Sequence, residues 1–146
     1  HEFFMKEALK EAQKAYEKDE IPIGAVVVAN NKIIARAHNL TQTLNDVTAH
    51  AEMQAITSAA NYIGGKYLLE CTLYVTLEPC IMCAGAMLHA RVERVVFGAA
   101  DPKTGAAGSV LNVFSEKQIN HQTQVEGGIM DDECGQVLRD FFKGRR

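Results

Sequence analysis

The sequence predicts an α/β protein of three layers, α/β/α, with helices on both faces of a mixed, five-stranded central sheet. Two observations predict this class. A β-rich hairpin comes first, and the strands that follow it alternate with helical segments, which is the order of a layered sheet. The chain has 146 residues, a usual length for one compact unit, so residues 1–146 are expected to form a single domain.

A helix and a hairpin open the chain. Between residues 2 and 18, apolar side chains recur every three or four positions among Lys and Glu, which predicts an amphipathic helix packed on the sheet. The β-rich runs 23–29 and 32–37 are separated by Asn30-Asn31, a pair that tolerates the positive φ angles of a tight turn. The first run is apolar on both faces and is therefore expected to be a central strand.

Helices and strands then alternate. Thr48 is expected to cap a helix over residues 49–62, which Gly64-Gly65 ends. Pro79 is expected in the first turn of a second helix, because its missing N–H needs no partner there. This second helix is expected to end at His89, and a last helix to span residues 131–142. Strands are expected at 73–77, 92–98 and 124–127, with a loop rich in Gly and Ala at 101–109.

Composition narrows the classes of function. The net charge of -3 gives no global attraction to polyanions, so nucleic-acid binding would need a local basic patch. No apolar run approaches the roughly 20 residues that cross a bilayer, so no membrane partner is expected. No secretory signal is recognised, and a cytoplasmic location is expected. Four cysteines in such a chain are expected to bind metal or pack in the core, not to form disulfides.

Two motifs lie where strands are expected to end and helices to begin, the usual place for ligands in α/β sheets. They are His50-Ala51-Glu52 and Pro79-Cys80-Ile81-Met82-Cys83. A Cys-x-x-Cys pair in a first helical turn directs both sulfurs the same way, and the helix N-terminus favours the thiolates that bind zinc. With His50 as the third ligand, a fourth position would stay open for water, as in catalytic zinc sites.

The combination of His-x-Glu with Pro-Cys-x-x-Cys is a signature of zinc deaminases. Deamination requires protonation of a ring nitrogen and of the departing amine, and such general acid–base catalysis contributes about 10²- to 10⁴-fold in rate. Glu52 is the expected proton shuttle. A structural zinc site is the alternative, in which a fourth protein ligand would come from Cys71, His38 or His89.

The sequence resembles the bacterial tRNA-specific adenosine deaminases over nearly its whole length. The resemblance implies the cytidine deaminase-like fold, a homodimer, one Zn²⁺ per subunit and conversion of adenosine to inosine at the wobble position of a tRNA anticodon. It implies zinc ligands His50, Cys80 and Cys83, proton shuttle Glu52, and the tRNA for arginine as substrate. The segments that carry the resemblance are 21–26, 48–52, 73–80, 82–87, 95–98, 103–109, 132–134 and 141–142.

The resemblance also implies the substrate contacts. Asn39 corresponds to the family asparagine that hydrogen-bonds the flipped-out base, although on its own it would also suit a turn. Asp101 and Lys103 correspond to positions near the target nucleotide and its neighbours. The expected pocket wall consists of Ile21, Pro22, Ile23, Ala51 and Pro79.

Other interpretations stay open at this point. A deaminase of free guanine or cytosine would use the same zinc chemistry in a closed pocket. A non-catalytic, zinc-stabilised RNA-binding module would hold its metal with four protein ligands. The basic residues Lys143, Arg145 and Arg146 at the C-terminus suit either a phosphate contact or simple solvation.

Overall fold

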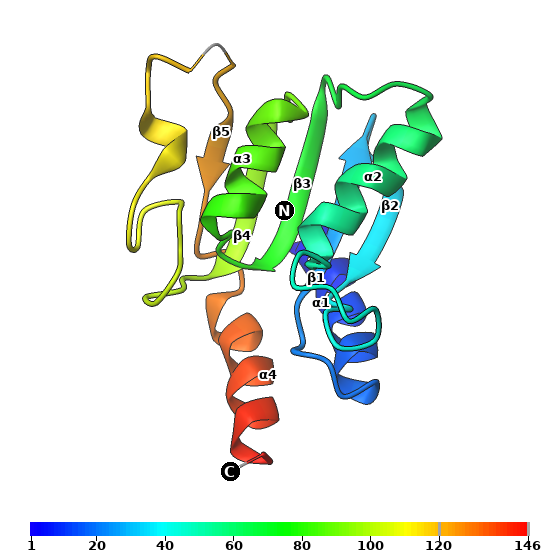
Figure 1. The fold of residues 1–146 in the computed structure, drawn as a ribbon, viewed down its shortest axis with the longest axis vertical. Helices are drawn as coiled ribbons and strands as arrows, with labels where there is room; N and C mark the ends of the chain where they lie inside the picture. Colours follow the sequence, from blue (N-terminus) through cyan, green and yellow to red (C-terminus); the bar gives the residue numbers. More distant parts are fainter. Residues whose placement is uncertain (120, 146) are drawn as a thin grey trace.

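The computed structural model describes residues 1–119 and 121–145 (Figure 1). Strands and helices alternate after an initial helix and hairpin, in the predicted order. The elements are α1 (Glu2–Glu17), β1 (Gly24–Ala29), β2 (Lys32–His38), α2 (Ala51–Ile63), β3 (Cys71–Leu77), α3 (Ile81–His89), β4 (Arg94–Ala99), the 3₁₀ turn η1 (Val113–Ser115), β5 (Gln124–Glu126) and α4 (Asp131–Lys143).

The five strands form one mixed sheet in the order β2-β1-β3-β4-β5. β1 is antiparallel to both β2 and β3, whereas β3, β4 and β5 are parallel. The turn between β1 and β2 has φ angles of 51° at Asn30 and 61° at Asn31, as the Asn-Asn pair predicts. The mixed five-stranded sheet and the central position of β1 are both confirmed.

Alternating side chains of β1 supply two separate cores. Ala25 and Val27 pack with residues of α2 and α3 on one face of the sheet. Val26 and Val28 pack with residues of α1 and α4, such as Ala8 and Cys134, on the other face. The helices α2 and α3 therefore cover one face and α1 and α4 the opposite one (Figure 1), which confirms the three-layer α/β/α prediction.

Both site-bearing helices begin later than the sequence predicted. The cap of α2 is His50, not Thr48, whose amide and hydroxyl both bond Asp46 Oδ1 at 2.8 and 2.7 Å. The cap of α3 is Cys80, so Pro79 lies before the helix instead of in its first turn. Before α2, the Asp46 carboxylate holds Thr48 outside the helix. Before α3, the Glu78 amide bonds the Ala99 carbonyl and the Pro79 carbonyl accepts from the Ala106 amide, so distant segments fix this stretch.

One side-chain contact aligns the strand ends that lead into the site. The Gly24 amide at the start of β1 donates to Thr76 Oγ1 near the end of β3, at 3.2 Å, and both groups are buried. The segment before β1 is thereby placed beside the segment that follows β3. Among the described residues, no helix combines the length and the apolar character that crossing a bilayer demands.

Candidate metal centre and its flanking loops

His50, Cys80 and Cys83 come together at the N-termini of α2 and α3. The Nδ1 atom of His50 lies 3.7 Å from the Cys80 sulfur and 3.5 Å from the Cys83 sulfur. All three potential ligand atoms lie within 4.8 Å of one another. Because Cys80 caps α3 and Cys83 is its third residue, the helix N-terminus directs both sulfurs to the same point. The structure thus brings together three potential ligands, of which His50 and Cys83 are 33 residues apart in sequence.

These donors fit a zinc ion. Tetrahedral zinc, with bonds of about 2.3 Å to sulfur and 2.0–2.1 Å to nitrogen, places its nitrogen and sulfur ligands about 3.5 Å apart. The nitrogen–sulfur distances of 3.5 and 3.7 Å in this cluster agree with that spacing. Two thiols and one imidazole are also donor types that zinc prefers. The site geometry therefore supports a metal centre without a large rearrangement of its ligands.

The electrostatics of the cluster favour a thiolate. A hydrogen bond with Cys83 lowers the pKa of Cys80 to about 4, although burial acts in the opposite direction. The same bond raises the pKa of Cys83. The hydrogen bond with Cys80 raises the pKa of His50. The protein thus holds one sulfur in the anionic form that binds metal.

Glu52 lies beside this cluster as the second residue of α2. Only 3% of its surface is exposed, and its Oε1 atom has no hydrogen-bond partner in the described structure. Burial raises the pKa of Glu52 to about 7. A buried carboxylate oxygen without a partner is costly, and such groups are concentrated at functional sites.

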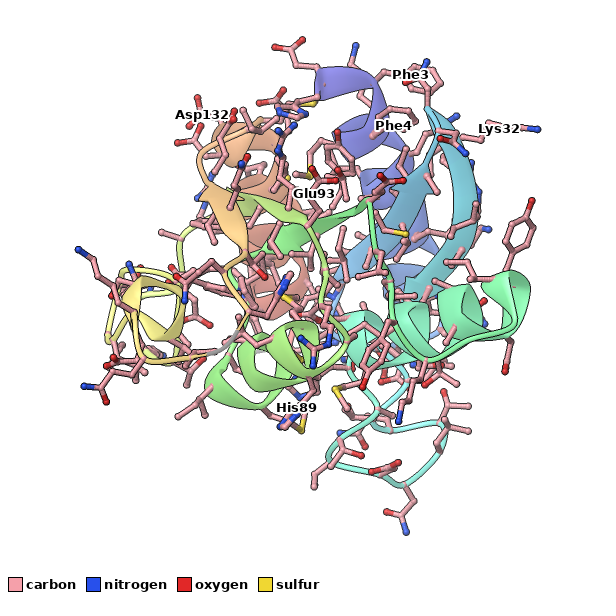
Figure 2. The ribbon with its side chains drawn as sticks, turned by 90° about the horizontal axis from the view of Figure 1, so that it is seen from above. Phe3, Phe4, Lys32, His89, Glu93 and Asp132 are labelled. Atoms are coloured by element: carbon pink, nitrogen blue, oxygen red, sulfur yellow. The ribbon has the colours of Figure 1, made fainter. Side chains whose placement is uncertain are left out.

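The alternative of a four-ligand structural site finds no support in the described residues. There, the cluster of potential ligands comprises His50, Cys80 and Cys83 alone. The sulfur of Cys71 donates instead to the Leu69 carbonyl at 3.5 Å, and His38 contacts Lys18 at 3.1 Å. His89 is exposed at the opposite end of α3, at the edge of the molecule in Figure 2.

Asn39 follows β2 directly and is 4% exposed. Its backbone N–H donates to the Ile23 carbonyl at 3.0 Å. Its side-chain Oδ1 accepts a bond from the Thr41 backbone N–H at 3.4 Å. The next residue, Leu40, donates to the carbonyl of Ala49 at 3.0 Å, next to the ligand His50. These bonds place the backbone around Asn39 beside the residue that precedes His50.

The residues of the expected pocket wall differ in burial. Ala51 is fully buried as the first residue of α2, and Pro22 and Pro79 are buried in the segments that flank β1 and β3. Ile23 is half-buried, and Ile21 is 37% exposed. Ile21 is therefore the most exposed of the five, and their role as a pocket wall stays a prediction.

Two loops flank the cluster. We call residues 39–48 the asparagine loop and residues 101–109 the glycine loop. In the glycine loop, the Asp101 carboxylate is used locally, since it accepts bonds from the Lys103 amide at 3.0 Å and the Thr104 hydroxyl at 2.8 Å. Lys103 is exposed. Nothing in the described contacts joins these two side chains to the metal ligands.

Sequence reasoning missed Glu78, which fastens the glycine loop. It is 3% exposed, and its carboxylate accepts bonds from the amides of Asp101, Ala107 and Ser109 at 3.0, 2.9 and 3.0 Å. The Ser109 hydroxyl is a fourth donor. The available signal was a glutamate placed directly between a buried strand and a proline, where a solvated side chain is not expected.

Sequence reasoning also missed Glu20, which fastens the asparagine loop. It is fully buried and accepts bonds from the amides of Gln42 at 3.0 Å and Thr43 at 2.6 Å. Its position, directly before Ile21, links this loop to the expected pocket wall. Each flanking loop is therefore held by one buried carboxylate.

The basic C-terminus is partly engaged within the protein. Arg145 stacks on the Phe141 ring, with its guanidinium carbon 3.6 Å from the ring centre, and forms an ion pair with Asp19. Lys143 ends α4 and is exposed. Arg146 lies outside the described residues. Solvation or packing therefore accounts for the described contacts of this segment.

Comparison with known proteins gives a consistent assignment. The model of the MafB19-like deaminase family matches residues 1–146. A tRNA-specific adenosine deaminase of Bacillus subtilis is 54% identical over 145 residues, which cover 99% of this chain and 90% of that protein. A protein of the same description from Aquifex aeolicus is 47% identical, with 99% and 95% covered.

Solved structures agree with this result. One from a study of A-to-I editing by tRNA:A34 deaminases superposes with a TM-score of 0.91 at 46% identity, covering 94% of this chain and all of the other. A guanine deaminase of Bacillus subtilis gives a TM-score of 0.67 at 40% identity, covering 75% of this chain and 70% of the other. The former similarity extends over more of both chains.

Proposed function

The chain belongs to the MafB19-like deaminase family, and from that premise we propose that it is a tRNA adenosine deaminase. In this reaction, water adds to C6 of the wobble adenosine, the bond from C6 to the exocyclic nitrogen breaks, and inosine and ammonia result. The observation that carries the proposal is the His50, Cys80 and Cys83 cluster with the unpartnered Glu52 oxygen beside it.

We infer that His50, Cys80 and Cys83 would hold one Zn²⁺ per subunit, because their number, type and spacing suit that ion. When bound there, zinc would supply Lewis acidity that makes a water molecule a good nucleophile at neutral pH. Three protein ligands would leave the fourth position of a tetrahedral zinc ion for water, as in catalytic zinc sites.

Glu52 would move the protons. Its free Oε1 can accept one proton from the attacking water and deliver it to N1 of the base. It can then take the remaining proton from the hydroxyl added at C6 and give it to the departing amine, which leaves as ammonia. Because the carboxylate is buried, bulk water does not compete for these protons. The backbone of α2 fixes Glu52 two residues after the ligand His50, so the shuttle and the metal keep a constant separation.

The substrate contacts are part of the same proposal. Asn39 would hydrogen-bond the edge of the extruded base, and the apolar wall would stack against it, formed by Ile21, Pro22, Ile23, Ala51 and Pro79. Asp101 and Lys103 would lie near the target nucleotide, with Lys103 free to meet a phosphate because it is exposed. Extruding a loop base costs less than opening a paired one, which favours an anticodon loop as substrate.

Inosine formation in a transcribed anticodon stem-loop tests the proposal. The zinc-loaded parent should convert the wobble adenosine, and the Asn39→Ala variant should do so more slowly because the base loses a polar contact. An inactive parent on stem-loop RNA, together with turnover of free guanine, would instead support a free-base deaminase. The higher identity and coverage of the tRNA deaminases disfavour that alternative.

We also propose a homodimer in the cytoplasm, acting on the tRNA for arginine. Apolar side chains support self-association, since Ile81 at the start of α3 is 62% exposed and Val110, in the loop after β4, is 54% exposed. Near the other end of α3, a cavity of about 420 Å³ is lined by Tyr67, Leu88 and Val113, among others. Sedimentation equilibrium tests the dimer, and turnover of a panel of tRNAs tests the substrate.

A further inference from the structure

Building on the proposed function, we propose that Glu78 is a positioning residue for the RNA substrate. It holds the glycine loop, and with it Lys103, in a fixed relation to the turn that supplies the ligand Cys80. The observation behind this proposal is a carboxylate that is 3% exposed and takes four hydrogen-bond donors from one loop.

The bonds to Glu78 span the whole glycine loop. Its Oε1 accepts from the Asp101 amide at the beginning of the loop and from the Ser109 hydroxyl at the end. Its Oε2 accepts from the amides of Ala107 and Ser109. One side chain thus satisfies three backbone N–H groups that no helix or strand pairs, and it draws the two ends of the loop together.

The same residue is joined to the metal centre through the backbone. Glu78 lies two residues before Cys80, and its own amide donates to the Ala99 carbonyl at the end of β4, at 2.8 Å. The carbonyl of Pro79 accepts a bond from the Ala106 amide at 2.9 Å. The glycine loop is therefore hydrogen-bonded to both residues that immediately precede Cys80, namely Glu78 and Pro79. Loss of these bonds would let the loop move relative to the cluster.

Gly105 shows how tightly the loop closes over this carboxylate. A Cβ atom built at Gly105 would lie 2.5 Å from Glu78 Oε2 and 2.6 Å from the Asp101 carbonyl oxygen. No side chain fits between the loop and the carboxylate. Three of the four bonds to Glu78 come from the loop backbone, so the carboxylate positions mainly the backbone of the loop.

Only an ionised carboxylate fits this set of partners. Every neighbouring group is a donor, and glutamine would direct its NH₂ group against at least one of them. Glutamine has nearly the same shape, so Glu78→Gln weakens the attachment of the loop without opening a cavity. Lys103, which projects from the same loop into solvent, should then lose its fixed position relative to the base pocket.

The test uses the zinc-loaded full chain and an anticodon stem-loop. We expect Glu78→Gln to raise KM about tenfold, the effect of losing one charge-assisted hydrogen bond, with kcat and zinc content unchanged. Glu93→Gln is the matched control, because Glu93 is exposed and lies just before β4, whereas Glu78 follows the parallel strand β3, so the two are at opposite ends of the sheet. The control should keep the parent KM.

A double-mutant cycle separates positioning from general loosening. Lys103→Ala should raise KM in the parent but should raise it much less in the Glu78→Gln background, because the lysine is already displaced there. Independent, additive effects would overturn the proposal, as would an unchanged KM in either single variant. Loss of zinc together with kcat in Glu78→Gln would also overturn it, since Glu78 would then act on the ligand turn.

Two further outcomes are distinguishable. If Glu78→Gln does not fold, Ser109→Ala takes its place, because it removes one donor and leaves the three backbone bonds. A smaller rise in KM is expected for it, and an unchanged KM would count against the proposal. A parent that forms no inosine in the stem-loop, by contrast, would refute the proposed function itself.

Discussion

Glu52 at the start of α2 and Glu78 at the junction of β3 and α3 are equally buried, each with 3% of its surface exposed. They differ in how many hydrogen bonds their carboxylate oxygens accept. Oε1 of Glu52 has no partner, whereas Glu78 accepts four hydrogen bonds. Burial raises the pKa of Glu52, while for Glu78 the bonds from Ser109, Asp101 and Ala107 outweigh burial and lower the pKa.

This difference teaches that burial alone does not identify a catalytic carboxylate. A buried acid with all its bonds satisfied stabilises the fold and stays charged, whereas one without partners remains available to exchange a proton. Glu20, also buried and bonded to two amides, belongs with Glu78. Buried glutamates thus hold the loops on either side, while the proposed proton shuttle is the glutamate whose Oε1 has no partner.

The largest effect should come from breaking the catalytic member of the pair. Glu52→Gln is expected to lower kcat on a stem-loop by about 10²- to 10⁴-fold, because the amide cannot carry protons. Its thermal unfolding should stay close to that of the parent, since Oε1 makes no bond that the substitution would break. Inosine quantification and calorimetry check this prediction, and activity equal to that of the parent would remove Glu52 from the mechanism.

The structural member should show the reverse pattern in stability. Glu78→Gln is expected to lower the free energy of unfolding by about 1.5–3 kcal/mol, the cost of disturbing hydrogen bonds to a charged group. Urea denaturation of the zinc-loaded protein measures it, with Glu93→Gln as the exposed control. A loss no larger than that of the control would mean that the bonds to Glu78 contribute little.

Glu20 sharpens the comparison through pH. Burial raises its pKa, but hydrogen bonds from Thr43 and Gln42 outweigh burial and place it below the ordinary value of 4.5. Its ionised form therefore stabilises the fold above pH 4.5, and this contribution is lost as the pH falls through the lower folded-state pKa.

Glu20→Gln should accordingly be less stable than the parent by about 1.5 kcal/mol at neutral pH, with the difference shrinking in acid. Urea midpoints of both proteins across this pH range measure the difference. A gap that widens on acidification would contradict the assigned direction of the pKa shift.

The smallest effect should come from removing a single donor. Ser109→Ala deletes one of the four bonds to Glu78 and should cost about 0.5–1.5 kcal/mol of unfolding free energy. Because three backbone amides still reach the carboxylate, the cost should be below that of Glu78→Gln. A larger cost for Ser109→Ala than for Glu78→Gln would reverse the roles assigned to these residues.

Most of the sheet and the cluster of potential metal ligands could be predicted, because each leaves a local pattern. The apolar run of β1 predicted a central strand, and the Asn-Asn pair predicted its turn. Short-range spacing did not locate the helix starts, since bonds such as that from Thr48 to Asp46 compete with capping. The roles of Asn39, Asp101 and Lys103 came from family resemblance and stay predictions.

Glu20 and Glu78 mark the limit of the sequence. By itself, the sequence determined the layered fold and the three potential ligands, and it singled out Glu52 as the candidate proton shuttle, because periodicity and motif spacing record local geometry. Only the tertiary structure decided which carboxylates are satisfied, because their donors lie 22 to 31 residues away in loops without a repeating pattern. Hydrogen-bond satisfaction depends on where distant backbone amides end up, and folding alone brings them within reach.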